Sequence, residues 1–215
     1  KLGIVILHLG GILILVGGGL TAMFSSEGNM VIEEGAKSNH VEDYHYMELA
    51  LINTSAVDFD EFTVFDQPLL IRNQTLTHEN LNFEIEILNY LENCEPTKRT
   101  SPPAIQYKGM LKNFMLKELK PEKEDNWNRP GIIYKISNSG TSADGMYGIF
   151  LGQPVPQTVS IKKKDFTIIL RRKRTYLPFS IELLDFKKIL HPGTDIPKSY
   201  SSDIILIENR AVRKI

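Results

Sequence analysis

The chain opens with an apolar run from Leu2 to Phe24 in which His8 is the one ionisable side chain. At about 1.5 Å per residue, a helix over this run is roughly 33 Å long and can cross a hydrocarbon core of about 30 Å. A secretory signal peptide has a shorter apolar part, about 7–15 residues, before a small-residue cleavage site. The residues from Leu20 to Phe24 match such a site poorly, so we expect a retained transmembrane helix over residues 1–25, embedded in a lipid bilayer.

Small residues divide the surface of this predicted helix. At about 100° per residue, one stripe contains Gly3, Gly10 and Gly17. A second stripe lies on the His8 side and contains Gly11, Gly18, Gly19 and Ala22. Small residues let helix backbones approach closely in lipid. We therefore expect helix packing on the second stripe, against partner helices that this single span does not supply.

An ionisable residue inside a membrane span is costly and usually functional. Three roles stay open for His8. As a neutral imidazole it can make an interhelical hydrogen bond or serve as an axial ligand of haem or another metal, and it can also relay protons. In each role the imidazole faces a neighbouring helix or a cavity and points away from acyl chains.

About 190 residues follow the helix, enough for one large or two small domains with a core. Basic and acidic side chains nearly balance, at 25 and 26, so nothing indicates a nucleic-acid partner. Lys1 precedes the span and no basic cluster follows it closely. By the positive-inside bias, we expect the N-terminus in the cytoplasm and residues 26–215 on the extracytoplasmic side.

Beyond the span, apolar and polar residues alternate over short stretches separated by turn residues, which is typical of antiparallel strands. The predicted strands cover 83–90, 131–136, 146–151, 166–171, 179–186 and 203–208. A short helix is expected only at 111–119, where Pro121 would stop it. The predicted fold class is mainly β, with the helix followed by an antiparallel β-sandwich or open barrel.

Two of the predicted strands share a sequence pattern. Phe83-x-Ile-Glu-Ile-Leu-Asn-Tyr90 is similar to Phe179-x-Ile-Glu-Leu-Leu-Asp-Phe186, and Pro96 and Pro192 follow at the same offset. This predicts an internal duplication with halves at 26–125 and 126–215. A chance similarity between two amphipathic strands is the alternative.

The single cysteine and the histidines outside the helix form no recognised catalytic set. Cys94 is the only cysteine, so we interpret it as a core or loop residue rather than a reactive thiol. His40 and His45 flank Glu42 and Asp43, a mixture that can bind a metal but is more often solvated. Two further histidines are expected in exposed turns, His78 and His191. We assign no catalytic residue and no metal site.

A basic cluster, Arg171, Arg172, Lys173 and Arg174, ends one predicted strand. Such charge commonly protects a sheet edge. Contact with haem propionates, anionic lipid or a partner is the alternative. Strand alternation places Arg171 and Lys173 on one face and Arg172 and Arg174 on the other, so at most half can serve one ligand.

A family resemblance adds to these observations. The segment 171–186, followed by His191-Pro-Gly-Thr194 and Pro197-Lys-Ser-Tyr-Ser-Ser-Asp203, resembles ResB-type (CcsB) cytochrome c biogenesis proteins. The opening His8-Leu-Gly-Gly, with Glu27-Gly28 and Glu33-Glu-Gly35, is similar to their transmembrane helix and first extracytoplasmic strand. Residues 53–157 match loosely. The family has several transmembrane helices where this sequence has one, so we interpret the chain as a fragment.

The resemblance implies a membrane component of cytochrome c maturation, in a bacterial cytoplasmic or thylakoid-like membrane. Residues 26–215 would be an extracytoplasmic ResB-like domain, and the partners would be a CcsA-type membrane protein and apocytochrome c. Haem would be shared with the partner, with His8 as its axial ligand. The partner's tryptophan-rich haem motif is absent, since Trp127 is the only tryptophan. The chain would thus be a synthase subunit, non-catalytic by itself.

Two other functions stay open at this point. The β domain can be an assembly scaffold that binds no haem, with His8 purely structural. If the motif match is accidental, the chain is an unrelated membrane-tethered β domain.

Overall fold

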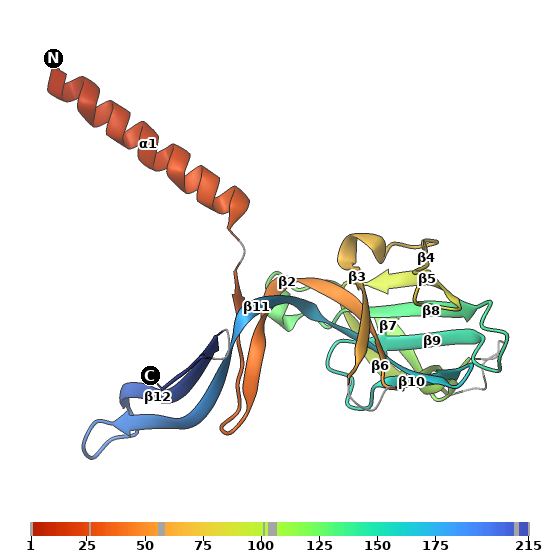
Figure 1. Cartoon of the computed structure of the whole chain (residues 1–215). Helices are drawn as coiled ribbons and strands as arrows, with labels where there is room; N and C mark the ends of the chain where they lie inside the picture. Colours follow the sequence, from red (N-terminus) through yellow and green to blue (C-terminus); the bar gives the residue numbers. More distant parts are fainter. Residues whose placement is uncertain are drawn as a thin grey trace.

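The computed structural model describes residues 2–25, 27–55, 59–100, 102, 107–208 and 211–214. Over these residues the chain is mainly β, with one N-terminal helix, antiparallel sheets and no closed barrel, which confirms the predicted fold class (Figure 1). The helix, α1, covers Leu2–Phe24, and none of its residues is buried. Its length and composition suit a membrane span, and a signal sequence near the N-terminus would satisfy the same criteria.

The strands form three sheets. The largest has seven strands, which are β1 (Gly28–Asn29), β2 (Lys37–Asn53), β3 (Glu61–Asp66), β10 (Gln157–Ile161), β11 (Lys164–Leu190), β12 (Pro197–Glu208) and β13 (Ala211–Lys214). The second has four, β4 (Thr75–Leu76), β5 (Glu84–Leu91), β8 (Gly131–Ser137) and β9 (Gly145–Phe150). The third pairs β6 (Cys94–Lys98) with β7 (Phe114–Glu118). Short 3-10 turns cover Gln67–Leu69, Gly109–Lys112 and Asp125–Trp127.

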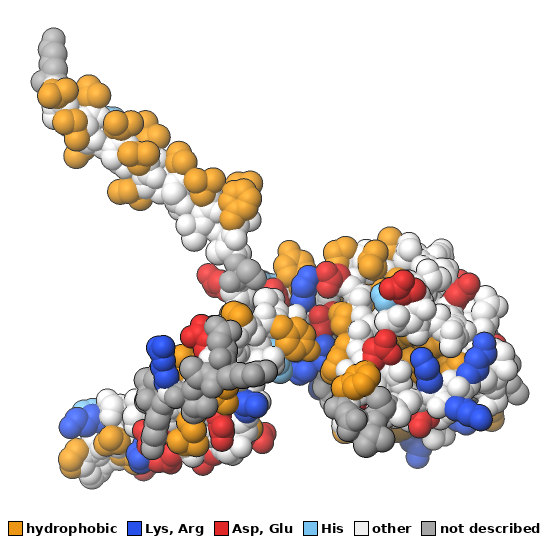
Figure 2. Space-filling model, in the orientation of Figure 1, with side chains coloured by type: hydrophobic (Ala, Val, Ile, Leu, Met, Phe, Trp, Pro, Cys, Tyr) orange, Lys and Arg blue, Asp and Glu red, His pale blue; other side chains and the backbone are white. Residues whose placement is uncertain are grey.

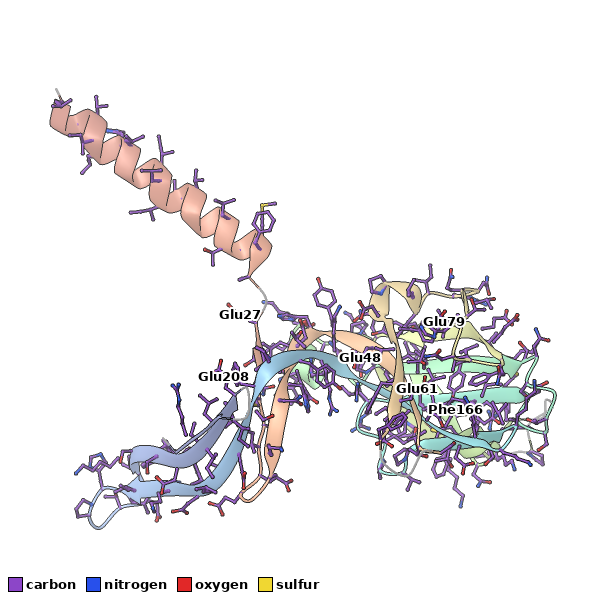
Figure 3. All side chains as sticks on the ribbon, viewed as in Figure 1. Glu27, Glu48, Glu61, Glu79, Phe166 and Glu208 are labelled. Atoms are coloured by element: carbon purple, nitrogen blue, oxygen red, sulfur yellow. The ribbon has the colours of Figure 1, made fainter. Side chains whose placement is uncertain are left out.

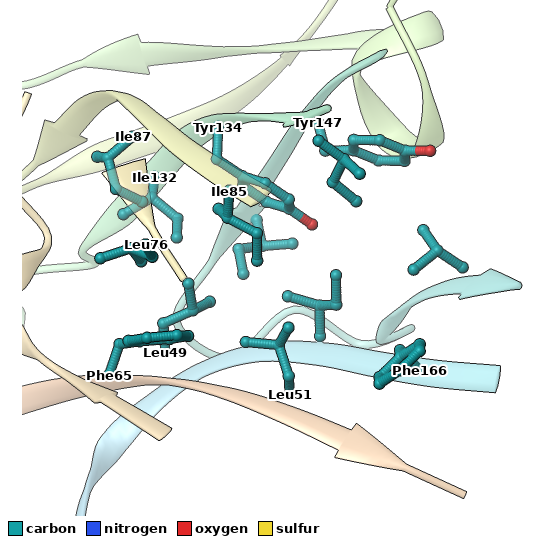
Figure 4. Close-up of a cluster of buried hydrophobic side chains, with 14 of the residues drawn as sticks. Leu49, Leu51, Phe65, Leu76, Ile85, Ile87, Ile132, Tyr134, Tyr147 and Phe166 are labelled. Atoms are coloured by element: carbon teal, nitrogen blue, oxygen red, sulfur yellow. The ribbon is translucent and has the colours of Figure 1, made fainter. Parts of the chain in front are cut away.

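One hydrophobic core lies between the first two sheets, which pack as a sandwich (Figure 4). Strand β2 contributes Leu49 and Leu51 and β5 contributes Ile85, all at most 1% exposed. Phe83 and Phe166 meet edge to face across the core, with ring centroids 5.2 Å apart. Because strand side chains alternate between faces, every second residue enters this core. Apolar burial between the sheets therefore holds the sandwich together.

Strand β11 runs through three parts of the molecule (Figure 1). Its first part belongs to the sandwich, where 166–170 pair with 49–53 of β2. We call 41–47 of β2 with 171–178 of β11 the neck. The rest of β11, paired with β12, forms an arm on the opposite side of the neck from the sandwich. Register shifts interrupt the β2 pairing between Arg172 and Arg174 and between Tyr176 and Ile181.

The predicted strands are confirmed, with one difference. Segments 166–171 and 179–186 belong to the single strand β11, although Pro178 lies between them. Proline cannot donate a ladder hydrogen bond. Pro178 is tolerated because it falls inside the register shift between Tyr176 and Ile181, where no β2 residue is paired with it.

The predicted helix at 111–119 is wrong. A 3-10 turn ends at Lys112, and Phe114–Glu118 form β7, which pairs with β6. Tertiary packing outweighs helix propensity here, because Leu116 is 8% exposed and packs with Leu91 and Cys94 in a small second core. A strand places that one side chain inward while its backbone completes the β6 ladder.

The two candidate halves are interlocked. Strand β2 of the first half pairs with β11 of the second, and β5 pairs with β8. The similar segments also differ in surroundings, since 84–91 lie in the sandwich whereas 179–186 lie in the arm. The halves are therefore not separate structural units, and the duplication stays a prediction.

Candidate functional site

The His8 side chain is held by its own helix. Its Nδ1 lies 2.7 Å from the carbonyl oxygen of Ile4, one turn earlier. Because a carbonyl only accepts, Nδ1 must carry the proton and donate it. In the neutral ring Nε2 then keeps its lone pair and is free to accept a hydrogen bond or to coordinate a metal. A hydrogen bond from the second nitrogen is also how proteins orient ligating histidines.

The small-residue face beside His8 is open. A Cβ added at Gly11, Gly18 or Gly19 would meet no atom within 4 Å, and Ala22 is exposed. Apolar side chains cover much of the remaining helix surface (Figure 2). The face can admit a closely packed helix or a flat ring. The structure brings no other described residue to it, so the expected packing on Gly11, Gly18, Gly19 and Ala22 stays a prediction.

The two histidines that flank acidic residues do not share a site. His40 Nε2 lies 3.9 Å from Glu42 Oε1. The His40 ring packs against the Tyr176 ring, with the two ring centroids 5.8 Å apart. His45 Nδ1 instead lies 2.6 Å from Asp125 Oδ2. Within the described ranges no three His, Cys, Asp or Glu side chains are grouped so that they could hold a metal ion.

The other two histidines lie where the sequence predicts. His78 is exposed in the turn after β4. His191 lies at the tip of the arm, where its N–H donates to the Ile196 carbonyl and its carbonyl accepts from Thr194.

A polar cavity of about 270 Å³, which the sequence did not predict, lies beside the neck and is partly lined by it. Its titratable lining comes from distant segments and consists of His45, Tyr90, Glu92, Asp125 and Arg172. Burial, with the charge of Glu92, raises the pKa of Tyr90 to about 12, so the phenol stays protonated. No sequence spacing could reveal this group, because three strands and the 125–127 turn assemble it. Hydrogen bonding to a polar ligand is the chemistry that it offers.

The basic cluster lies inside β11 rather than at its end, so the predicted strand end is wrong. Arg171 pairs with Glu48 at 2.7 Å, Lys173 with Asp66 at 2.7 Å and Arg174 with Glu42 at 2.8 Å. Since Glu48 and Asp66 are cross-strand partners, Arg171 and Lys173 share a face as predicted. Arg172 instead donates to the Tyr44 carbonyl and to Asn126. Three of the four cations are therefore neutralised within the sheet.

Cys94 is a core residue, as the sequence predicts. Its thiol is 2% exposed and packs with Leu91 and Leu116. Burial raises the pKa of Cys94 to about 11, although the nearby Arg129 acts in the opposite direction. The thiolate needed for attack or metal binding is therefore scarce near neutral pH.

No protein-family model matches this chain, and no curated protein matches it significantly.

Proposed function

We propose that the chain is a membrane component of the cytochrome c maturation machinery and acts with a CcsA-type haem-handling partner. Two features support this. The residues at both ends of the chain resemble ResB-type proteins, and α1 carries an imidazole suited to haem. The geometry of His8 carries the proposal, because its Nδ1–H is committed to Ile4 and Nε2 remains available.

In this proposal haem is the substrate in transit. His8 Nε2 would hold its iron, and the open glycine face would leave room for a partner helix and the macrocycle close to α1. Neutral imidazole suits this position because it introduces no charge into the membrane.

The β domain then has a positioning role on the extracytoplasmic side. Attachment adds the two thiols of apocytochrome c across haem vinyl groups, a reaction that depends on orientation more than on a protein nucleophile. The buried, unreactive position of Cys94 agrees with that role. The polar cavity at the neck is one surface that can hydrogen-bond to a partner in this role.

A scaffold that binds no haem itself is the second candidate. It is favoured by the β domain, where the apolar cavity between Pro96 and Phe150 has no histidine in its lining. The two candidates differ only in what His8 does. They therefore make opposite predictions for a His8 variant.

The test is the haem spectrum of the complete protein purified with its partner. We expect b-type haem in the complex, and His8→Ala should lower the haem content or change the ligation spectrum. His78→Ala is the matched control, since it removes an exposed imidazole of the sandwich. Unchanged haem stoichiometry and spectrum in His8→Ala would eliminate His8 as a ligand and favour the scaffold.

A further inference from the structure

One edge of β11 lacks a neighbouring strand over the neck. Strand β10 pairs with β11 only as far as Ile168, and β12 pairs with it only from Phe179. Between these limits, residues 169–172 and 174–176 pair with β2 on the other edge. On the open edge, no strand among the described residues is paired with them. Unpaired N–H and C=O groups of this kind are a template for another strand.

The gap has a defined direction and length. Both β10 and β12 run antiparallel to β11, so a strand placed between them would continue the same antiparallel sheet. Ten residues of β11 span roughly 33 Å at about 3.3 Å per residue. An extended segment of up to about ten residues can therefore fit.

Charge does not shield this edge. Native edges are commonly protected by lysines and arginines that face an incoming strand. Here Arg171, Lys173 and Arg174 are drawn back across the sheet into ion pairs with carboxylates of β2 and β3. The backbone groups of the edge are left without that protection.

Two residues that line a cavity of about 180 Å³ at one end of the open edge each have one buried polar atom without a partner among the described residues. Arg171, 7% exposed, uses Nε for Glu48, and its Nη2 has no partner among the described residues. Gln153 donates from Nε2 to the Val155 carbonyl at 2.6 Å, which leaves its Oε1 as a buried acceptor without a partner. Both residues line this cavity. Both atoms are enclosed by their neighbours, so a peptide group reaches them only after the Gln153 and Arg171 side chains turn toward the edge.

A second cavity lies near the other end of the gap. Thr175 and Leu177 of β11 line this cavity together with Gly28, four residues after the helix ends. In Figure 3, Glu27 marks this position beside the neck. Because β2 lies between β1 and β11, this cavity lies on a face of the sheet, and the open edge of β11 is on the side away from Gly28.

We propose that the open edge of β11, with the Arg171 and Gln153 cavity, binds an extended polypeptide segment by antiparallel strand addition. Recognition is through the peptide backbone and is therefore tolerant of sequence. Naming the segment as unfolded apocytochrome c rests on the proposed function. The binding site itself does not, because it is defined by the unpaired strand and the two unmet polar atoms.

Backbone methylation of a probe peptide tests the pairing. Two fluorescent ten-residue peptides of high β-propensity, one containing Cys-Ala-Ala-Cys-His and one with both cysteines replaced by serine, are titrated against the full chain in nanodiscs by anisotropy. We expect both to bind, within about threefold of each other. Two N-methylated versions are compared, one methylated at the odd-numbered and one at the even-numbered peptide residues. Only one of these two sets of N–H groups faces β11, so one version should bind at least about tenfold more weakly and the other should change little.

Thiol alkylation tests the location. A bromoacetyl peptide should alkylate Thr175→Cys, with loss of bromide, much faster than it alkylates the control Thr77→Cys, an equally exposed threonine in the sandwich. Buried Cys94 contributes little background. Gln153→Leu removes the unmet acceptor without touching the Glu48 pair, and it should weaken peptide binding severalfold.

Three results would overturn the proposal: no peptide binding, equal effects of the two methylation patterns, or equal alkylation at the two cysteines. Cross-linking of two Thr175→Cys chains in the absence of peptide would also overturn it, by identifying a second copy as the occupant. The haem content of the complex is independent of these measurements. Failure here therefore differs from failure of the proposed function.

Discussion

Arg171 donates from Nε to Oε1 of Glu48 at 2.7 Å, and the two side chains join β11 to β2 where the sandwich becomes the neck. Glu48 is labelled at this place in Figure 3. Arg171 and Glu48 are 7% and 3% exposed. Glu48 Oε2 also accepts from the backbone N–H of Arg174 at the register shift. The Glu48 carboxylate therefore neutralises the buried Arg171 and also accepts a hydrogen bond from a backbone N–H at the register shift.

Breaking this pair from one side should be costly. Glu48→Ala leaves the Arg171 guanidinium buried without its counter-charge, and we expect a loss of about 3–5 kcal/mol in the free energy of unfolding. Urea denaturation of the full chain in detergent measures this change. Replacing both residues with apolar side chains of similar size, Glu48→Leu with Arg171→Met, should restore most of the loss. Equal stability of Glu48→Ala and the unaltered protein would contradict the assigned role.

Two stacked tyrosines of the sandwich provide a matched pair of hydroxyl deletions. Tyr134 and Tyr147 lie with ring centroids 5.6 Å apart. The Tyr147 hydroxyl donates to the Ala143 carbonyl, whereas the fully buried Tyr134 hydroxyl has no partner among the described residues. Tyr147→Phe should therefore destabilise by about 1 kcal/mol, while Tyr134→Phe should be neutral or stabilising because it removes a desolvated polar group. The reverse order in the same denaturation assay would contradict this.

The Cys94 thiol should be unreactive in the folded protein. With the pKa raised from 9.0 to about 11, the thiolate fraction at pH 8 falls roughly 100-fold. Burial reduces access further. Iodoacetamide labelling followed by mass spectrometry should show slow alkylation that becomes rapid in denaturant. Rapid alkylation of the native protein would show that the thiol is exposed.

His40 should make the neck sensitive to acid. Burial lowers its pKa below the usual 6.5, Arg174 and Arg171 lower it further, and Glu42 and Glu48 act in the opposite direction. The unfolded chain therefore binds a proton more readily than the folded chain. Stability should rise with pH up to about 6.5 and be lost as the pH falls below that value. His40→Gln should flatten this part of the pH profile, and an unchanged profile would exclude His40 as its source.

Local patterns were enough to predict the helix, the β class and the main strands. The apolar run with one imidazole is visible without any fold, and alternation identifies 131–136 or 166–171 because each faces a core on one side. The error at 111–119 has a clear reason. Leu116 packs on Cys94, and a nine-residue window contains no information about that contact.

The site residues that depend on strand pairing could not be predicted. Glu48 and Arg171 are 123 positions apart, and His45 and Asp125 are 80 apart. Alternation did place Arg171 and Lys173 on one face. It could not show that these side chains form ion pairs with acidic residues of β2 and β3. The open edge of β11 is likewise a property of where β10 ends and β12 begins, and the sequence around 171–174 instead suggested the end of a strand.

Because we propose that this chain acts in cytochrome c maturation, cells without it should fail to mature c-type cytochromes. The most direct measurement is covalent haem in c-type cytochromes, detected by haem-peroxidase staining of denaturing gels, in a strain that lacks the gene for this protein. We predict loss of the stained c-type bands, with b-type haem still present in membranes and recovery on complementation with the unaltered gene. Normal c-type bands in the deletion strain would contradict the account.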